Sequence, residues 1–167
     1  MKNIYLASGS KARKDILEKL GLKIKVVKSN VREKRSLCKC SYPELVKTNA
    51  LRKALDISGR IKSGLVIAAD TLCVQDGKIF GKPKNLKSAR LMLKKLSSKP
   101  QDLYSGIAVV KKERSGIRTL VDYEKTRVYM DRLSDEEIKS YFSKVSPLDK
   151  AGSFDIQGRG ALFVRRI

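Results

Sequence analysis

The chain has 167 residues, enough for one domain with a single core, and its 38 Lys and Arg against 17 Asp and Glu give a formal charge of +21. Hydrophobic residues make up 41% of it, which excludes a disordered chain. It contains no histidine. Catalysis by a Ser-His or Cys-His pair is therefore excluded, and an enzyme of this composition must use carboxylates, lysines or a metal-bound water.

The cysteines and the N-terminus exclude further classes of protein. Cys38 and Cys40 are too closely spaced for a zinc knuckle, and Cys73 stands alone. No apolar stretch reaches membrane-spanning length, and the segment 1–4 leads directly into a strand rather than a signal peptide. We therefore expect a cytoplasmic protein that makes no contact with membranes.

The first elements form a strand, a loop and a helix. Residues 4–7 predict a strand that breaks at Ser8, and helical spacing then runs from a cap at Ser10 to a stop at Gly21. The positive end of this helix can hold an anion. Arg13 lies on the apolar face, which would aim its guanidinium over the helix start, but the sequence alone slightly favours the alternative of an ordinary surface arginine.

A second strand and a second helix follow. Residues 22–27 alternate apolar and lysine side chains as a half-solvated strand does, and Glu33 comes just past its end. After a polar loop, Pro43 begins a helix whose apolar stripe contains Lys53. An inward lysine either extends its stem to solvent or meets an anion, and the sequence alone favours the first.

Asp70 is the most informative residue of the chain. It ends the apolar run 65–69, which predicts an inner strand, and so it stands where open α/β sheets form their ligand crevice. The segment 71–80, with its Asp-Gly turn, predicts a hairpin that returns Lys82 towards it. A carboxylate and a lysine in a basic chain favour phosphate chemistry. The alternative is that Asp70 only begins a turn.

The remaining half of the chain is predicted to complete the sheet. The patterns predict a helix over 86–96 capped by Asn85, a long hairpin of 104–110 with 117–130, a helix opened by Ser134-x-x-Glu137 and ended by Pro147, a glycine-rich loop over 149–160, and a last strand over 161–164. A glycine-rich loop of this kind permits close approach of the backbone to a ligand.

Four motifs taken together resemble one family, and their residues are Leu6-Ala7-Ser8-Gly9-Ser10 with Arg13, Ala69-Asp70-Thr71, Gly81-Lys82-Pro83, and Asp149-Lys150-Ala151-Gly152 with Ile156-Gln157-Gly158. In this order they are similar to the Maf family of nucleotide pyrophosphatases. The resemblance implies a single α/β domain over 1–167, with a mixed twisted sheet, flanking helices and two lobes around a cleft, like the inosine triphosphate pyrophosphatases. It also implies hydrolysis of a nucleoside triphosphate to the monophosphate and pyrophosphate.

The resemblance also implies roles for individual residues. Asp70 matches the general base, and Glu33 with Asp70 matches the ligands of a divalent metal, Mg²⁺ or Mn²⁺. Thr71 and Gln157 match positions that mark the branch acting on dTTP and UTP. The other substrate-binding positions of the family fall on Ser8, Arg13, Lys53, Lys82 and Lys150. The family is further associated with homodimers and with arrested cell division.

The chain departs from the family pattern at a few positions. It has Ala12 before Arg13 where members have a second arginine, and Arg32 before Glu33 where members have a second acid. It lacks the usual histidine before Tyr104, and it ends at Ile167, where members continue. The alternative function is a basic protein of weakened catalysis that contacts nucleic acid without sequence specificity or regulates division, and the +21 charge favours nucleic-acid contact.

Overall fold

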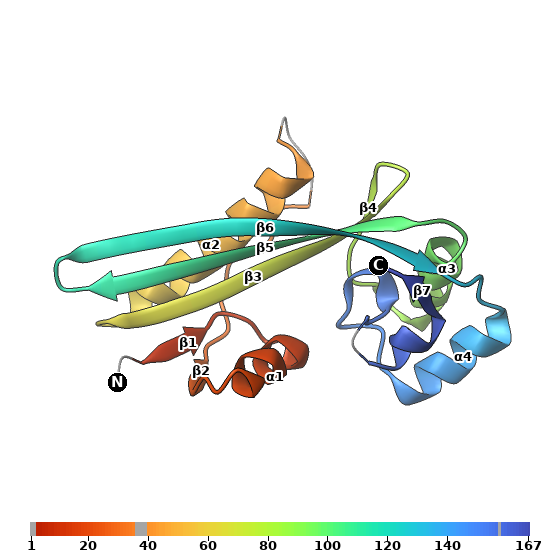
Figure 1. The fold of residues 1–167 in the computed structure, drawn as a ribbon, viewed down its shortest axis with the longest axis horizontal. Helices are drawn as coiled ribbons and strands as arrows, with labels where there is room; N and C mark the ends of the chain where they lie inside the picture. The colour runs from red at the N-terminus through yellow and green to blue at the C-terminus, as the bar shows by residue number, and fades with distance from the viewer. Residues whose placement is uncertain (1–2, 36–39, 157) are drawn as a thin grey trace. The chain divides into compact units, whose positions relative to one another are not determined.

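The computed structural model describes residues 3–35, 40–156 and 158–167 and contains a mixed sheet with flanking helices (Figure 1). Among these residues, seven strands follow the order β2-β1-β3-β5-β6-β7, with β4 paired to β3. The strands are β1 (Ile4–Leu6), β2 (Ile24–Val26), β3 (Gly64–Gln75), β4 (Lys78–Phe80), β5 (Gln101–Glu113), β6 (Gly116–Met130) and β7 (Val164–Arg166). The predicted mixed α/β fold is confirmed.

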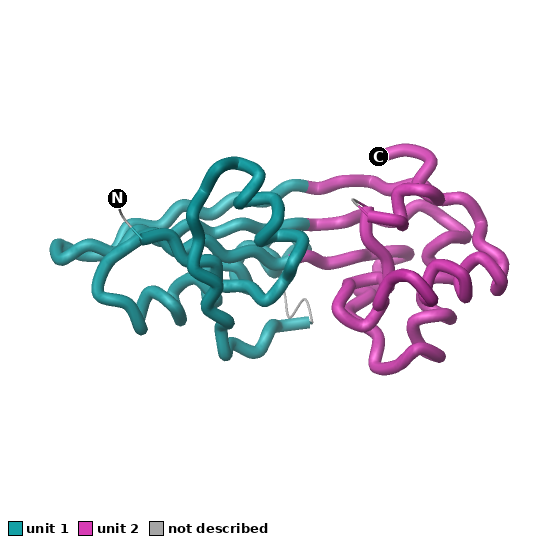
Figure 2. Tube along the Cα trace, turned by 90° about the horizontal axis from the view of Figure 1, so that it is seen from below, with its two compact units in different colours: residues 1–70, 105–124 teal, residues 71–104, 125–167 magenta. Residues whose placement is uncertain are grey.

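The chain divides into two compact units, coloured separately in Figure 2. The first unit contains residues 1–70 and 105–124, and the second contains residues 71–104 and 125–167. The helices α1 (Lys11–Lys19) and α2 (Tyr42–Arg60) belong to the first unit, and α3 (Leu86–Leu96) and α4 (Asp135–Lys144) belong to the second. Each unit has its own apolar core and is described by itself.

The core of the first unit lies between α2 and the sheet. β1 runs parallel to both β2 and β3, which is typical of an α/β sheet. The α2 helix begins with a capping box in which Ser41 and Glu44 each bond the other's backbone, and its apolar face packs on the strands. The buried residues of this core are Ala7, Ala50, Ala54, Ile57, Val66, Ala68, Ala108 and Val110.

Gly106, a residue without a side chain, sets the distance between α2 and β5. A Cβ built on Gly106 of β5 would lie 2.5 Å from the backbone carbon of Val46 and 2.8 Å from the backbone nitrogen of Lys47. Only a residue without a side chain fits there, because the obstacle is the helix backbone, which cannot rotate away. Gly106 thus fixes how closely α2 approaches the sheet that carries the candidate site.

The second unit is built around α3 and α4. Capping boxes begin both helices, from Asn85 with Ser88 and from Ser134 with Glu137, as the sequence predicts for Asn85 and for the Ser134-x-x-Glu137 motif. The hairpin of β3 and β4 turns through Asp76 and Gly77, both at positive φ, in agreement with the predicted Asp-Gly turn. No helix in the described ranges is long and apolar enough to cross a bilayer.

Two predictions about strands are wrong. β3 does not end before Asp70 but continues through it to Gln75, so Asp70 lies in the middle of a long strand. β1, the parallel neighbour, pairs with β3 only as far as Ile67, and Asp70 therefore still lies beyond the carboxyl end of an adjacent strand. The predicted last strand over 161–164 is largely a 3-10 turn, Arg159–Phe163, and β7 begins only at Val164.

We expect Gly106→Ala to lower the free energy of unfolding by about 1–3 kcal/mol, because its methyl group must push α2 away from β5. Urea unfolding followed by circular dichroism measures this. The matched control is Gly59→Ala on α2, whose added Cβ meets no atom within 4 Å and should leave stability equal or slightly raised. Equal stabilities of the Gly106 variant and the parent would contradict the close approach.

Candidate functional site

The Asp70 carboxylate is buried and held at both oxygens. Its exposed fraction is 2%. Asn49 donates from Nδ2 to Asp70 Oδ2 at 2.8 Å, and Lys53 donates from Nζ to Asp70 Oδ1 at 2.9 Å. The two donors lie four residues apart on α2, which puts them on one face of the helix, one turn apart. The remaining lone pairs of the carboxylate can accept a further proton or ligand.

Lys53 joins two acids inside the first unit. Its Nζ is 2.5 Å from Glu33 Oε1, 2.9 Å from Asp70 Oδ1 and 3.3 Å from the carbonyl oxygen of Ala69. The residue is 7% exposed. The expectation that Lys53 extends its stem to solvent is therefore wrong, because an ammonium at this depth needs anionic partners and finds two.

The loop after β2 delivers Glu33 to this ammonium. Asn49 accepts from the backbone nitrogen of Lys34 and donates to its carbonyl, each at 2.9 Å, which anchors the loop to α2. Glu33 also pairs with Arg35. The pKa of Glu33 lies below its ordinary value: burial alone raises it, but the hydrogen bond and charge of Lys53 and the charge of Arg35 outweigh burial.

Arg13 reaches back from α1 to the loop before it. Its Nη1 donates to Ser8 Oγ at 3.2 Å and to the carbonyl of Ala69 at 2.8 Å. Burial lowers the pKa of Arg13, while the negative charges of Asp70 and Glu33 oppose the shift. The guanidinium is thus directed over the helix start, and the alternative of an ordinary surface arginine is wrong.

The structure brings together five residues that the sequence predicts for a site, namely Ser8, Arg13, Glu33, Lys53 and Asp70, all within the first unit. We call them the site cluster. Sequence reasoning missed Asn49, which is completely buried and contacts both Asp70 and the Glu33 loop. The sequence did contain an indication of this role, because a polar amide is unusual on the apolar stripe of a helix, here one turn before Lys53.

The other predicted site residues belong to the second unit or are not described. Thr71 follows Asp70 on β3 and is half-buried, and Lys82 is exposed between β4 and α3. Lys150 donates to Asp149 Oδ1 at 2.7 Å and to the carbonyl of Ser146 at 3.0 Å. Gln157 lies outside the described residues.

One hydrogen bond links two of the sequence motifs inside the second unit. Gly152 donates from its backbone nitrogen to the carbonyl of Gly81 at 3.2 Å. Gly152 has a φ of 75°, which favours glycine, and a Cβ there would meet Leu96 and Phe154. The segment that carries Lys150 is therefore held beside the segment that carries Lys82.

The oxygens around Lys53 suit a hard divalent cation. Glu33, Asp70 and the carbonyl of Ala69 provide carboxylate and carbonyl oxygens, the ligands that Mg²⁺ and Mn²⁺ prefer. In the described residues, no group of three His, Cys, Asp or Glu side chains could hold a metal ion. A cation here would take two carboxylates from the protein and complete its shell with water or phosphate, as Mg²⁺ commonly does.

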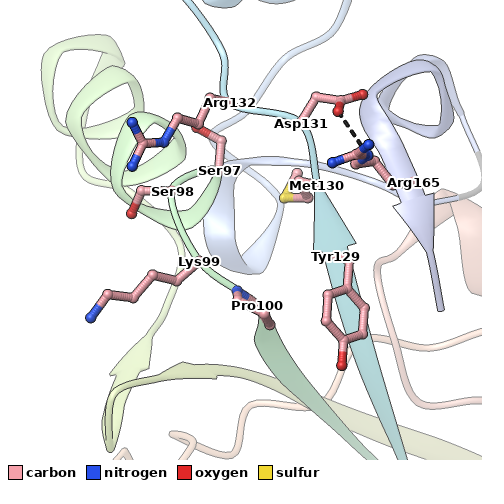
Figure 3. A pocket seen from close by; sticks show the side chains of 9 residues that line it. All are labelled: Ser97, Ser98, Lys99, Pro100, Tyr129, Met130, Asp131, Arg132 and Arg165. Carbon is pink, nitrogen blue, oxygen red and sulfur yellow. Dashed lines mark ion pairs between the residues drawn. The ribbon is translucent and has the colours of Figure 1, made fainter.

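A hollow of about 350 Å³ lies elsewhere, within the second unit (Figure 3). Lys99, Arg132 and Arg165 line it, but their side chains point in different directions in Figure 3. Arg165 is paired with Asp131 at 3.1 Å, and Lys99 with Asp76 at the same distance. Because these positive charges do not converge on one point, the hollow does not form an anion-binding site.

Comparisons with known proteins identify a family and several similar proteins. The model of the family described as Maf-like protein matches residues 3–167. The dTTP/UTP pyrophosphatase of Dictyoglomus thermophilum is 42% identical over 99% of this chain and 85% of its own length. That of Bacillus cereus is 40% identical over 100% and 80%. A solved dITP/XTP pyrophosphatase from Mycobacterium abscessus is 15% identical with a TM-score of 0.43, covering 78% of this chain and 74% of its own.

We expect Lys53→Met to lower the free energy of unfolding at pH 7 by about 3 kcal/mol in chelator, because it leaves two acids without their shared ammonium. Because the pKa of Glu33 is lowered in the folded state, its ionisation stabilises the fold at pH values above the ordinary pKa of 4.5. This stabilisation is lost as the pH falls through the lowered pKa of the folded state. The difference between parent and variant should therefore shrink below pH 4.5.

Denaturant unfolding at a series of pH values measures the difference. Lys47→Met is the matched control on α2, because the ammonium of Lys47 lies over the ring of Tyr123 without reaching the site cluster, and its loss should cost less than about 1 kcal/mol at every pH. A penalty for Lys53→Met that stays constant from pH 7 to pH 3 would contradict the ion pairs.

Proposed function

Since this chain belongs to the Maf family, we propose that it hydrolyses a pyrimidine nucleoside triphosphate, dTTP or UTP, to the monophosphate and pyrophosphate. The names of the relatives support this substrate class. The single observation that carries the proposal is the buried carboxylate of Asp70, held by Asn49 and Lys53 within the site cluster. In a chain without histidine, a carboxylate is one of the few groups that can accept the proton.

In the proposed reaction, Asp70 takes a proton from a water molecule whose oxygen forms a bond to the α-phosphorus. The bond from that phosphorus to the bridging oxygen breaks, and its electron pair leaves with pyrophosphate. Asn49 and Lys53 orient the carboxylate, since each fixes one oxygen through a hydrogen bond shorter than 3 Å. Arg13 and Lys53 supply fixed positive charge against the phosphate oxygens.

Substrate contacts from the second unit complete the proposal. Lys82 and Lys150 are proposed to bind phosphate groups, and the hydrogen bond from Gly152 to Gly81, which joins their two segments, supports a shared role. Thr71 and Gln157 are proposed to read the pyrimidine. The amide of Gln157 can offer both a donor and an acceptor to a pyrimidine edge.

Glu33 and Asp70 are proposed to hold Mg²⁺ or Mn²⁺. When bound, the cation would supply positive charge against the phosphate oxygens. Lys53 Nζ lies between these two carboxylates, so the ammonium and the metal compete for the same oxygens. If a cation took these oxygens, Lys53 would lose at least one of its two acids, and its charge would then be available to the substrate.

We expect Asp70→Asn to lower kcat by about 10²- to 10⁴-fold while the protein still folds, because an amide cannot accept the proton. Pyrophosphate release from dTTP, UTP and GTP with Mg²⁺ measures this. The control is Asp76→Asn at the exposed β3–β4 turn, where positive φ suits asparagine and activity should be unchanged. Near-parental turnover by the Asp70 variant would falsify the assignment of the base.

The same assay separates the alternative function. A basic nucleic-acid-binding protein with weakened catalysis would release no pyrophosphate from any triphosphate and would shift an oligonucleotide in a gel even at raised salt. An enzyme whose +21 charge attracts nucleic acid without specificity should lose that shift as salt rises.

We expect Lys53→Met to bind Mn²⁺ at least about 10-fold more tightly than the parent in the absence of nucleotide, because the competing ammonium is gone. Electron paramagnetic resonance of free Mn²⁺ measures this without any turnover. Lys47→Met should bind as the parent does. Equal or weaker Mn²⁺ binding by the Lys53 variant would show that the metal does not share these oxygens.

A further inference from the structure

The loop that delivers Glu33 to the site cluster has no regular structure of its own. Residues 27–35 follow β2 and belong to no helix or strand. Their position must therefore come from contacts with neighbouring elements, because a loop without such contacts samples many conformations. Side chains of α2 make these contacts, and two of the residues involved, Arg52 and Asp56, have no role in the proposed reaction.

Asp56 binds the first half of the loop. Its Oδ2 accepts from the hydroxyl of Ser29 at 2.8 Å and from the backbone nitrogen of Asn30 at 3.0 Å. The Ser29 hydroxyl in turn accepts from the backbone nitrogen of Val31 at 3.1 Å, which closes a short turn. One carboxylate oxygen thus holds three consecutive residues of the loop, two directly and the third through Ser29.

Arg60 holds the Asp56 carboxylate in place. Its Nη2 donates to Asp56 Oδ1 at 2.6 Å and to Oδ2 at 2.8 Å, from one turn further along α2. The pKa of Asp56 lies below its ordinary value: burial alone raises it, but the hydrogen bonds of Ser29 and Asn30 and the charge of Arg60 outweigh burial. The carboxylate is therefore ionised at neutral pH, and an ionised acceptor forms the stronger hydrogen bonds.

α2 also holds the second half of the loop. Arg52 donates from Nη1 to the carbonyl of Arg32 at 3.2 Å. Asn49 accepts from the backbone nitrogen of Lys34 and donates to its carbonyl, each at 2.9 Å. Glu33 lies between these two contacts, so the backbone on either side of it is bonded to the helix.

The three α2 residues share one face of the helix, because Asn49, Arg52 and Asp56 follow the i, i+3, i+7 spacing. The loop runs along this face in the direction opposite to the helix, since Asn30 is held at Asp56 and Lys34 at Asn49. The two anchors are about 10 Å apart along the helix axis, and the chain from Asn30 to Lys34 reaches at most about 14 Å. The segment between the anchors therefore has little slack.

We propose that Asp56 is a positioning residue for Glu33. It fixes one end of the loop, Asn49 fixes the other, and Glu33 is thereby kept within reach of Lys53. In the described residues Asp56 bonds to no member of the site cluster, so it acts through the loop. The consequence for metal binding rests on the proposed function, which makes Glu33 a ligand. The anchoring of the loop does not.

The simpler alternative is that Asp56 only stabilises α2 through its ion pair with Arg60. Such pairs, four residues apart, are common on helix surfaces and contribute little to stability. Arg60→Ala removes the pair and leaves both loop contacts of Asp56. Ser29→Ala removes one loop contact and leaves the pair. The two variants therefore separate the two roles.

Amide hydrogen exchange, followed by NMR in the metal-free protein, tests the anchoring. We expect Asp56→Ala and Ser29→Ala each to raise the exchange rate of the Lys34 amide at least about 10-fold, although Lys34 lies at the far end of the loop. Arg60→Ala should keep the parental rate. Asp56→Asn should have a smaller effect than Asp56→Ala, because the amide oxygen can still accept both loop hydrogen bonds.

Two results of this experiment would overturn the proposal. One is a parental Lys34 rate in both Asp56→Ala and Ser29→Ala, which would show that the loop holds its position without this anchor. The other is an effect of Arg60→Ala as large as theirs, which would show that the ion pair within α2 is the contact that matters.

Mn²⁺ binding without nucleotide tests whether Asp56 acts through Glu33. We expect Asp56→Ala to weaken binding about 10-fold, because the residues that orient a metal ligand contribute to affinity, and to have no further effect in a Glu33→Gln background. Electron paramagnetic resonance of free Mn²⁺ measures both. An equal loss in both backgrounds, or no loss by Asp56→Ala where Glu33→Gln weakens binding, would overturn the proposal.

The two measurements also separate this proposal from the proposed function. If Glu33→Gln itself bound Mn²⁺ as the parent does, the metal role of Glu33 would be wrong. The exchange rate of the Lys34 amide would still decide whether Asp56 positions the loop, since that measurement uses neither metal nor nucleotide.

Discussion

The candidate site depends on a buried ammonium that meets two acids. Lys53 comes from α2, Asp70 from β3 and Glu33 from the loop after β2, so these ion pairs join three separate parts of the first unit. An isolated charge at this depth would cost several kcal/mol, and the fold is therefore committed to keeping these groups together. Asn49 serves the same arrangement without charge, because its amide holds Asp70 on one side and the Lys34 backbone on the other.

The helices could be predicted because their signals are local. Ser134 with Glu137 and Asn85 before its apolar stripe each mark a helix start through hydrogen bonds within four residues. Strand ends depend instead on neighbours that lie far along the chain. β3 continues through Asp70 and pairs with β4 beyond the end of β1, and no local sequence pattern indicates this. The 3-10 turn before β7 is likewise a matter of packing, since Phe163 is drawn into the core of the second unit.

The site was predictable in its chemistry and less so in its contacts. Residue types suited to phosphate chemistry at the breaks between elements pointed to Glu33 and Asp70, and the structure brings both to Lys53. The sequence could not tell whether Lys53 faces solvent or an acid, because that depends on where the loop bearing Glu33 returns. The role of Asn49 could not be predicted for a related reason. Its partner is the backbone of that loop, and every residue type offers the same backbone groups, so the sequence does not show which residue Asn49 binds.

The site cluster has a further property that follows from its membership. Arg13 and Lys53 carry two positive charges, and Glu33 and Asp70 carry two negative ones, so the cluster is electrically neutral although the chain as a whole is strongly basic. A polyanion that approaches a neutral cluster gains no net attraction from it and must bring its own counter-charge. If a phosphate chain binds at the site cluster as we propose, its binding should therefore depend on cations from outside the cluster, and so on the ionic composition of the solution.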